Sequence, residues 1–274
     1  MAFVFPQLGW TCRQGNPERN ASGSSLLTQY FRDMWSLFRF APCLLLVFAG
    51  CAGSPTDSMS DNDNSTRDVW APLARYVDVR EAEFDAIPSD RQEELKALGE
   101  FVRTVRDTGE AKLIFICTHN SRRSHFGQVW AQVAAHHYGI DSLVTTFSGG
   151  TESTAFNERA VGALRRAGLD IHPAVLSENP QYAIHYAEDR DPMVCFSKKY
   201  DDVEHNPTSA FAAVMTCSNA DKGCPIVPGS VARFSTPFTD PKVSDGTPEE
   251  VATYDERCAQ IAREMLFAMN HARD

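Results

Sequence analysis

A cysteine, an arginine six residues later and a serine directly after it are the residues of this sequence best suited to chemistry. They are Cys117, Arg123 and Ser124. A cysteine thiolate is a strong nucleophile, and it forms readily beside a cation or a helix N-terminus. A guanidinium group can hold two oxygens of a tetrahedral anion and stabilise charge in the transition state, and a serine hydroxyl can hydrogen-bond the thiolate. These residues predict an enzyme that acts on phosphate or a phosphate mimic.

The residues between Cys117 and Arg123 are expected to form an oxyanion-binding loop. A short apolar run, Leu113–Ile116, predicts a buried strand before the loop, and a helix is predicted to begin at Ser124 after it. Backbone N–H groups in such a loop turn inward, and the helix N-terminus adds partial positive charge. Asn120 can adopt the positive φ that a tight loop requires. The loop residues are Thr118, His119, Asn120, Ser121 and Arg122.

The rest of the chain alternates between strand and helix patterns, which is typical of a doubly wound α/β domain with a parallel sheet. Apolar residues three and four apart predict a helix from Ser89 to near Gly109, with Gln92 completing a capping box. The last helix is predicted to begin with Thr247 as its N-cap. Further strands are expected over 143–147, 192–196 and 211–216, and a helix over 157–167. A single domain over 73–274 accounts for these elements.

Residues 111 to 270 resemble the low-molecular-weight protein tyrosine phosphatase superfamily, which includes the thioredoxin-coupled arsenate reductases. The resemblance rests on segments 117–124, 147–161 and 238–241. It implies a single three-layer α/β domain with a short parallel sheet, of about four strands, flanked by helices. It also implies a role for Asp240, which precedes Pro241, as the general acid that protonates the leaving group.

Two further cysteines, Cys217 and Cys224, lie seven residues apart after a predicted strand. This segment is similar to the redox segment of the arsenate reductases. The resemblance implies that Cys117 condenses with arsenate, that Cys217 attacks to release arsenite, and that Cys224 takes over the disulfide, which a thioredoxin-like partner then reduces. A structural disulfide and two inert thiols are the alternatives for this pair.

The loop departs from the family pattern at two positions. His119 and Arg122 stand where the family commonly has glycine and cysteine. His119 is expected to stiffen the loop or narrow its mouth, and Arg122 to add a cation that favours thiolate or anion. Both leave the nucleophile in place, so the loop still predicts an enzyme, and the pair Cys217 and Cys224 makes arsenate reduction the expected activity. Hydrolysis of phosphate monoesters through a phosphocysteine, and non-catalytic binding of a phosphorylated ligand, are the alternatives.

The N-terminal part of the chain has the pattern of a bacterial lipoprotein leader. Arg39 is followed by an apolar run, Phe40–Gly50, that is too short to span a bilayer, and then by Cys51. The sequence therefore predicts a leader over 1–51 with lipidation at Cys51, a disordered linker over 52–72, and a helical extension over 73–110 before the domain over 111–274. A genuine leader implies attachment to the membrane of a bacterial cell envelope. An incidental apolar segment implies a cytoplasmic protein.

The composition limits the classes of partner. The formal net charge of −10 gives no general attraction for nucleic acid, so specificity for anions must be built locally. The substrate is expected to be a small oxyanion or a phosphate ester. No cofactor is expected, and no spacing of cysteine and histidine indicates a metal site. Cys195 and Cys258 are interpreted as core residues.

Overall fold

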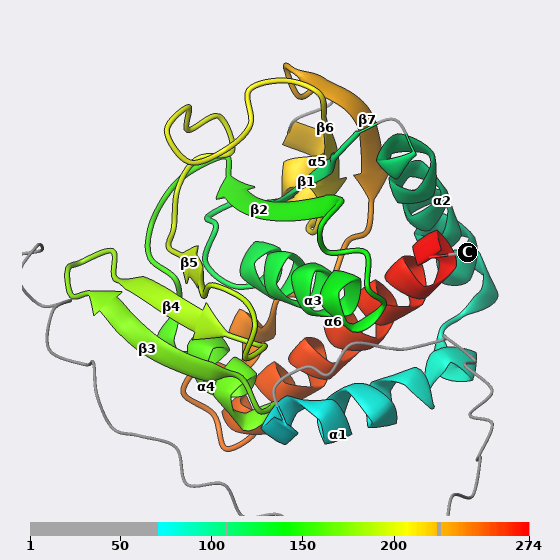
Figure 1. Ribbon diagram of the computed structural model, residues 1–274. Coiled ribbons are helices and arrows are strands. Elements are labelled where there is room, and N and C mark those ends of the chain that lie inside the picture. The colour runs from blue at the N-terminus through cyan, green and yellow to red at the C-terminus, as the bar shows by residue number, and fades with distance from the viewer. Residues whose placement is uncertain (1–70, 108, 224–225, 274) are drawn as a thin grey trace, which may run out of the picture. The chain divides into compact units, whose positions relative to one another are not determined.

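The computed structural model describes residues 71–107, 109–223 and 226–273 (Figure 1). The predicted leader, its lipidation site Cys51, most of the predicted linker and the third relay cysteine, Cys224, lie outside the described residues. Their assignments stay predictions. Within the described ranges, no helix is both long enough and apolar enough to cross a membrane.

A four-stranded parallel sheet with strand order β2-β1-β6-β7 forms the centre of this part of the chain. β1, the strand that precedes the Cys117 loop, lies between β2 and β6. The strands predicted over 143–147 and 211–216 therefore both pair directly with β1. Five consecutive buried apolar residues make up β6, as expected of a strand covered on both faces. The bounds are Ala111–Cys117 for β1, Val144–Gly150 for β2, Phe211–Met215 for β6 and Ser230–Ser235 for β7.

The predicted strand over 192–196 does not belong to the parallel sheet. It is β5, Met193–Cys195, and it lies in a separate antiparallel sheet with β3, Asp170–Val175, and β4, Gln181–His185. The fourth parallel strand is instead β7, which the sequence did not predict. β7 is a half-buried edge strand that contains Arg233 and two serines, so it lacks the continuous apolar run used to find the others.

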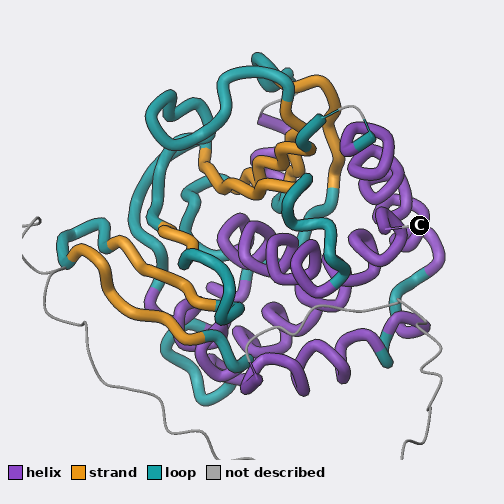
Figure 2. The backbone as a smooth tube through the Cα atoms, in the orientation of Figure 1, coloured by secondary structure: helices purple, strands orange, loops and turns teal. Residues whose placement is uncertain are grey.

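Helices cover both faces of the parallel sheet (Figures 1 and 2). On one face, α3 packs against β1, β2 and the long C-terminal helix α6, which in turn contacts α1, α2 and α4. On the other face, α5 packs against β1 and β6. The helices are α1 Ala71–Glu81, α2 Ser89–Arg106, α3 Arg123–His137, α4 Glu158–Arg166, α5 Ser218–Gly223 and α6 Glu250–Arg273, with 3-10 turns η1 Phe84–Ala86 and η2 Pro241–Ser244.

The helix caps agree with the sequence only in part. Asn157 caps α4 as its side chain accepts a hydrogen bond from the backbone of Arg159. Ser89 is not an N-cap, because α2 is preceded by Pro88 without a side-chain cap, and Gln92 donates to the carbonyl of Ile87 instead of forming a capping box.

The last helix begins later than predicted. α6 starts at Glu250, and the Thr247 hydroxyl donates to the Ser244 carbonyl, 2.8 Å away. Thr247 therefore stabilises the turn after η2 rather than capping the helix. Pro248, the residue after Thr247, lies in the turn that precedes α6.

Two helical glycines provide a matched test of the packing between α3 and β1. A Cβ on Gly127 would lie 2.4 Å from Cδ1 of Phe115, which is fully buried, whereas a Cβ on Gly162 would meet only a guanidinium nitrogen of Arg166 at 3.2 Å. We expect Gly127→Ala to lower the free energy of unfolding by about 1–3 kcal/mol through overpacking. Gly162→Ala should be neutral or raise it by up to about 1 kcal/mol through helix propensity. Urea denaturation measures both, and equal stability of the two variants would contradict the packing described.

Candidate active site

The Cys117 thiol lies in a loop between the carboxyl end of β1 and the N-terminus of α3, as the sequence predicted. Its sulfur is 3.1 Å from Oγ of Ser124, and Nδ2 of Asn120 donates to the same Oγ at 2.9 Å. The backbone N–H of Lys198 donates to Oδ1 of Asn120 at 2.8 Å. Since a backbone N–H can only donate, it fixes the orientation of the Asn120 amide. The Ser124 oxygen therefore accepts from Asn120, and its own hydrogen is available to donate to the sulfur when Cys117 is a thiolate.

Asn120 adopts the positive φ expected of it, 44°, and it is fully buried. Its carbonyl accepts a hydrogen bond from Nε2 of His125 at 3.0 Å. The neighbouring carbonyl of His119 accepts from the hydroxyls of Ser197 and Thr154 at 3.0 and 3.1 Å. The loop conformation is thus held by bonds from α3, from the segment after β2 and from the segment after β5.

Arg123 and Asp240, distant in sequence, lie together at the site. Nη2 of Arg123 is 2.6 Å from Oδ2 of Asp240, and Nη1 donates to the carbonyl of Phe238 at 3.0 Å. Asp240 also accepts from the backbone N–H of Lys242, so its carboxylate caps η2. The structure therefore brings the predicted anion-binding arginine and the predicted acid into direct contact. Charge-assisted pairing of this kind is short and directional.

The other loop side chains point to partners around the rim or away from it. Oγ of Ser121 donates to the carbonyl of Ala155 at 2.8 Å. His119 is about half exposed, and its Nε2 lies 3.6 Å from a carboxylate oxygen of Glu152. The guanidinium of Arg122, which was expected to add positive charge for the thiolate or the anion, is directed instead toward α6. Arg122 thus contributes its backbone to the loop while its side chain is occupied elsewhere.

Cys217 lies beside the loop, two residues after the end of β6, the strand that pairs with β1. Its sulfur is 3.5 Å from Oγ1 of Thr118 and accepts from the backbone N–H of Ala220 at 3.3 Å. Only 1% of Cys217 is exposed. The first two predicted relay cysteines, Cys117 and Cys217, also belong to the same small buried cluster.

The two cysteines interpreted as core residues are buried as expected. Burial raises the pKa of the Cys195 thiol, and likewise that of Cys258, to about 12. Both are therefore protonated thiols at neutral pH and poor nucleophiles.

Sequence reasoning missed His125 as a residue of this site. It is fully buried, stacks on Phe156 with ring centroids 3.8 Å apart, and its Nδ1 lies 3.2 Å from the Ser148 hydroxyl. Burial, together with the positive charge of Lys198, holds the pKa of His125 well below its usual value. A neutral imidazole can donate from Nε2 to the Asn120 carbonyl and accept at Nδ1. A histidine one residue after the loop motif carried no sequence signal of this role.

Segment 197–200 was also missed. The backbone N–H of Gly150 donates to the Lys198 carbonyl, and that of Tyr200 donates to the Gly150 carbonyl, both at 2.9 Å. These bonds join the segment to the end of β2, from where Ser197 and Lys198 reach the loop. The contribution of Lys198 to Asn120 comes from its backbone, so the residue type could not have indicated it.

Comparison with known proteins finds several relatives and no matching family model. An arsenate reductase from Bacillus licheniformis is 33% identical over 145 residues, which cover 53% of this chain and 84% of the relative. An arsenate reductase from Bacillus subtilis is 28% identical over 151 residues, covering 54% and 87%. Among solved structures, a low-molecular-weight protein tyrosine phosphatase from T. tengcongensis matches with 13% identity, 59% and 99% coverage and a TM-score of 0.40.

The parallel sheet flanked by helices, with a cysteine loop at the carboxyl end of its interior strand β1, defines the α/β class of the fold. The identity to the Bacillus licheniformis relative over most of that relative's length then gives the family. The chain belongs to the low-molecular-weight protein tyrosine phosphatase superfamily that includes the arsenate reductases, and it is an enzyme of that kind.

The buried neutral His125 predicts a specific pH dependence of stability. In the unfolded chain this histidine binds a proton below about pH 6.5, whereas in the folded protein its lowered pKa keeps it neutral. The unfolded state therefore binds more protons, so this contribution to stability is complete above pH 6.5 and is lost as the pH falls below it. In His125→Gln the free energy of unfolding should decline less between pH 7.5 and 5.5, by about 1 kcal/mol. Identical declines in urea titrations of both proteins would contradict a neutral His125.

Proposed function

We propose that this enzyme reduces arsenate to arsenite through a relay of cysteines. The observation that carries the proposal is the position of Cys217. Its sulfur lies against the Thr118 hydroxyl of the nucleophile loop, two residues after the end of β6, the strand that pairs with β1. A phosphate-ester hydrolase needs one thiol at this site, whereas a reductase of this type needs a second thiol within reach of the first.

The first step uses the Cys117 loop. The Cys117 thiolate attacks arsenic, and an arsenic–oxygen bond breaks. Arsenate displaces Asp240 from Arg123, Asp240 takes up a proton from solvent and passes it to the departing oxygen, and that oxygen leaves as water. Arg123 and the backbone N–H groups of the loop hold the remaining oxygens and stabilise their charge. The contact between Arg123 and Asp240 supports this step, because it brings the acid to the anion site.

The second step uses the other cysteines. The Cys217 thiolate attacks the sulfur of Cys117, the electron pair of the sulfur–arsenic bond stays with arsenic, and arsenite leaves as the Cys117–Cys217 disulfide forms. Arsenic is thereby reduced by two electrons and the two thiols are oxidised. Cys224 then attacks Cys217, which frees Cys117, and a thioredoxin-like dithiol reduces the Cys217–Cys224 disulfide.

The surroundings of Cys217 support its role as an attacking thiolate. The Thr118 hydroxyl and the Ala220 N–H can both donate to a negatively charged sulfur. Because Cys217 is almost completely buried and accepts from the Ala220 N–H of α5, its sulfur must become more exposed before a further thiol can attack it. The proposal therefore includes a rearrangement of Ser218–Gly223 during each turnover.

The same loop supports a second candidate function, hydrolysis of phosphate monoesters. Cys117 would attack phosphorus, Asp240 would protonate the leaving oxygen, and water would then hydrolyse the phosphocysteine. The direct contact between Asp240 and Arg123 favours this chemistry as much as it favours the first step of arsenate reduction. Only the step that uses Cys217 separates the two functions.

Paired assays of cysteine variants separate them experimentally. Arsenate reduction, coupled to thioredoxin, its reductase and NADPH, and hydrolysis of an aryl phosphate are measured on the same preparations. Cys117→Ser should lose both activities by about 100-fold or more, since the nucleophile is absent. Cys217→Ala should lose arsenate reduction while any hydrolysis stays within about threefold of wild type. Cys195→Ala, which removes a buried thiol of the small sheet, is the matched control and should keep both.

Two outcomes would contradict the reductase. Wild type could hydrolyse the aryl phosphate without reducing arsenate under saturating reductant, which would make it a phosphatase. Alternatively, Cys217→Ala could reduce arsenate at the wild-type rate, which would exclude Cys217 from the relay.

A further inference from the structure

Arg122 connects the nucleophile loop to two other parts of the fold. Its Nε donates to the Tyr254 hydroxyl at 2.7 Å, and its Nη2 lies 3.4 Å from Oδ2 of Asp245. The Tyr254 hydroxyl donates to the other carboxylate oxygen of Asp245, also at 2.7 Å. The three side chains form a closed triangle, here called the Arg122–Tyr254–Asp245 cluster. One member comes from the loop, one from α6 and one from the residue directly after η2.

The cluster is shielded from water, so its bonds are little screened. Tyr254 is fully buried, and the side chains of Arg122 and Asp245 are 12% and 24% exposed. Burial, reinforced by the negative charge of Asp245, raises the pKa of Tyr254 to about 12. The hydroxyl therefore stays protonated at neutral pH and continues to donate to Asp245. Hydrogen bonds in such surroundings are stronger than at a fully exposed site.

Asp245 is coupled to the acid Asp240 through the short turn η2. Asp240 caps this turn by accepting from the Lys242 N–H at 3.1 Å, and the Asp245 N–H closes it by donating to the Lys242 carbonyl at 3.1 Å. The Ser244 hydroxyl donates to the Pro241 carbonyl within the same turn. Residues 240–245 thus form a compact unit, so an anchor at Asp245 also limits the movement of Asp240.

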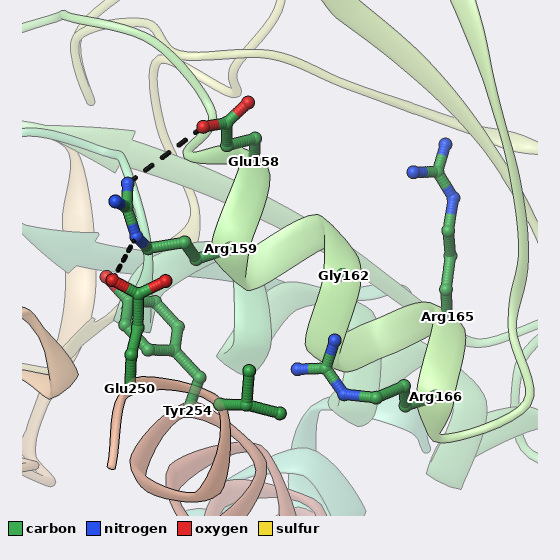
Figure 3. Close-up of a pocket in the computed structure, with 8 residues that line it drawn as sticks. Glu158, Arg159, Gly162, Arg165, Arg166, Glu250 and Tyr254 are labelled. Carbon is green, nitrogen blue, oxygen red and sulfur yellow. Dashed lines mark ion pairs between the residues drawn. The ribbon is translucent and has the colours of Figure 1, made fainter. Parts of the chain in front are cut away.

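A second anchor holds the chain just beyond Asp245. The Gly246 N–H donates to the carboxylate of Glu250, which pairs with Arg159 of α4 at 2.9 Å. Figure 3 shows this pair beside Tyr254, at a pocket of about 380 Å³ between α4 and α6. The anchor lies on the side of Asp245 away from Asp240. It holds the chain after Asp245 against α6, whereas Arg122 links Asp245 to the nucleophile loop.

We propose that the Arg122–Tyr254–Asp245 cluster positions the general acid Asp240 beside the Cys117 loop. Arg122 and Tyr254 are then positioning residues and do not touch the substrate. The inference rests on the proposed function, in which Asp240 protonates the departing oxygen. It assigns a purpose to an arginine that stands where the family commonly has cysteine.

The need for such an anchor follows from the contact between Arg123 and Asp240. A tetrahedral anion that binds in the loop engages the Arg123 guanidinium and competes with Asp240 for it. Asp240 then loses its direct bond to the loop at the moment when its proton is needed. The cluster keeps the 240–245 unit in place during that exchange, because the Arg122 side chain is bonded to Tyr254 and Asp245 and does not bind the anion.

Leaving-group dependence tests the positioning role. Tyr254→Phe removes the hydroxyl at the centre of the cluster and keeps the buried ring. The assay measures kcat for phenyl phosphate, whose leaving group needs a proton, and for 2,4-dinitrophenyl phosphate, whose leaving group does not. For Tyr254→Phe we expect kcat to fall about 10-fold or more with phenyl phosphate, and by less than about threefold with the dinitrophenyl ester. Asp240→Asn should show the same selectivity in stronger form.

Tyr138→Phe is the matched control. Tyr138 lies directly after the C-terminal end of α3, at the opposite end of that helix from the loop. The substitution removes a partly buried hydroxyl that donates to Glu81. This variant should leave both esters unaffected. Equal losses of both esters in Tyr254→Phe, or no loss of either, would overturn the positioning role.

Hydrogen exchange of the amides in 238–246 provides a readout that is independent of turnover. Exchange in this segment should be about 10-fold faster in Tyr254→Phe than in wild type and unchanged in Tyr138→Phe. Unchanged exchange in Tyr254→Phe would overturn the cluster as an anchor. If wild type neither hydrolyses an ester nor reduces arsenate while exchange responds as expected, the proposed function fails and the anchor stands.

Discussion

The side-chain amide of Asn120 bonds in two directions from a backbone conformation that few residues adopt. Its oxygen accepts from the Lys198 backbone and its nitrogen donates to Ser124, while a φ of 44° directs the loop around the Cys117 thiol. This orientation leaves the Ser124 hydrogen available to a Cys117 thiolate. The geometry at the nucleophile therefore depends on a residue that never contacts the sulfur itself.

The positive charge of the loop is balanced by one short segment of the chain. The consecutive arginines 122 and 123 each face an aspartate at opposite ends of the turn η2, Asp245 and Asp240. An acidic chain with a formal net charge of −10 thus concentrates two cations at its anion site and neutralises both until an anion arrives. One arginine can exchange its carboxylate for a substrate, and the other is held in a buried triangle. Arg122 and Arg123 are residues of the same type, and they differ in role because their side chains point in different directions.

The sequence predicted those parts of the site that are local in the chain. The strand, the loop and the helix around Cys117 follow from a continuous apolar run, a motif of eight residues and the helical spacing after it. That Asp240 and Cys217 belong to the site could be inferred only through the family resemblance, because each lies about a hundred residues from its partner in the loop motif. β3, β4 and β7 were missed because they are partly exposed or polar, and β5 was predicted as a strand but assigned to the parallel sheet. The direction of the Arg122 side chain depends on Tyr254, 132 residues away, and no local pattern indicates it.

The contacts from segment 197–200 also bear on how the enzyme matures. The Lys198 backbone reaches Asn120 across 78 residues of chain, and Ser197 reaches His119 across the same interval. Bonds between such distant segments depend on closing a long stretch of chain, which costs conformational entropy. A partly folded chain can have β1 and α3 in place while the Asn120 amide still lacks the bond that orients it. The reactive thiol is therefore fully assembled only when the chain between these segments has folded, and incomplete molecules carry a cysteine that is not yet prepared for attack.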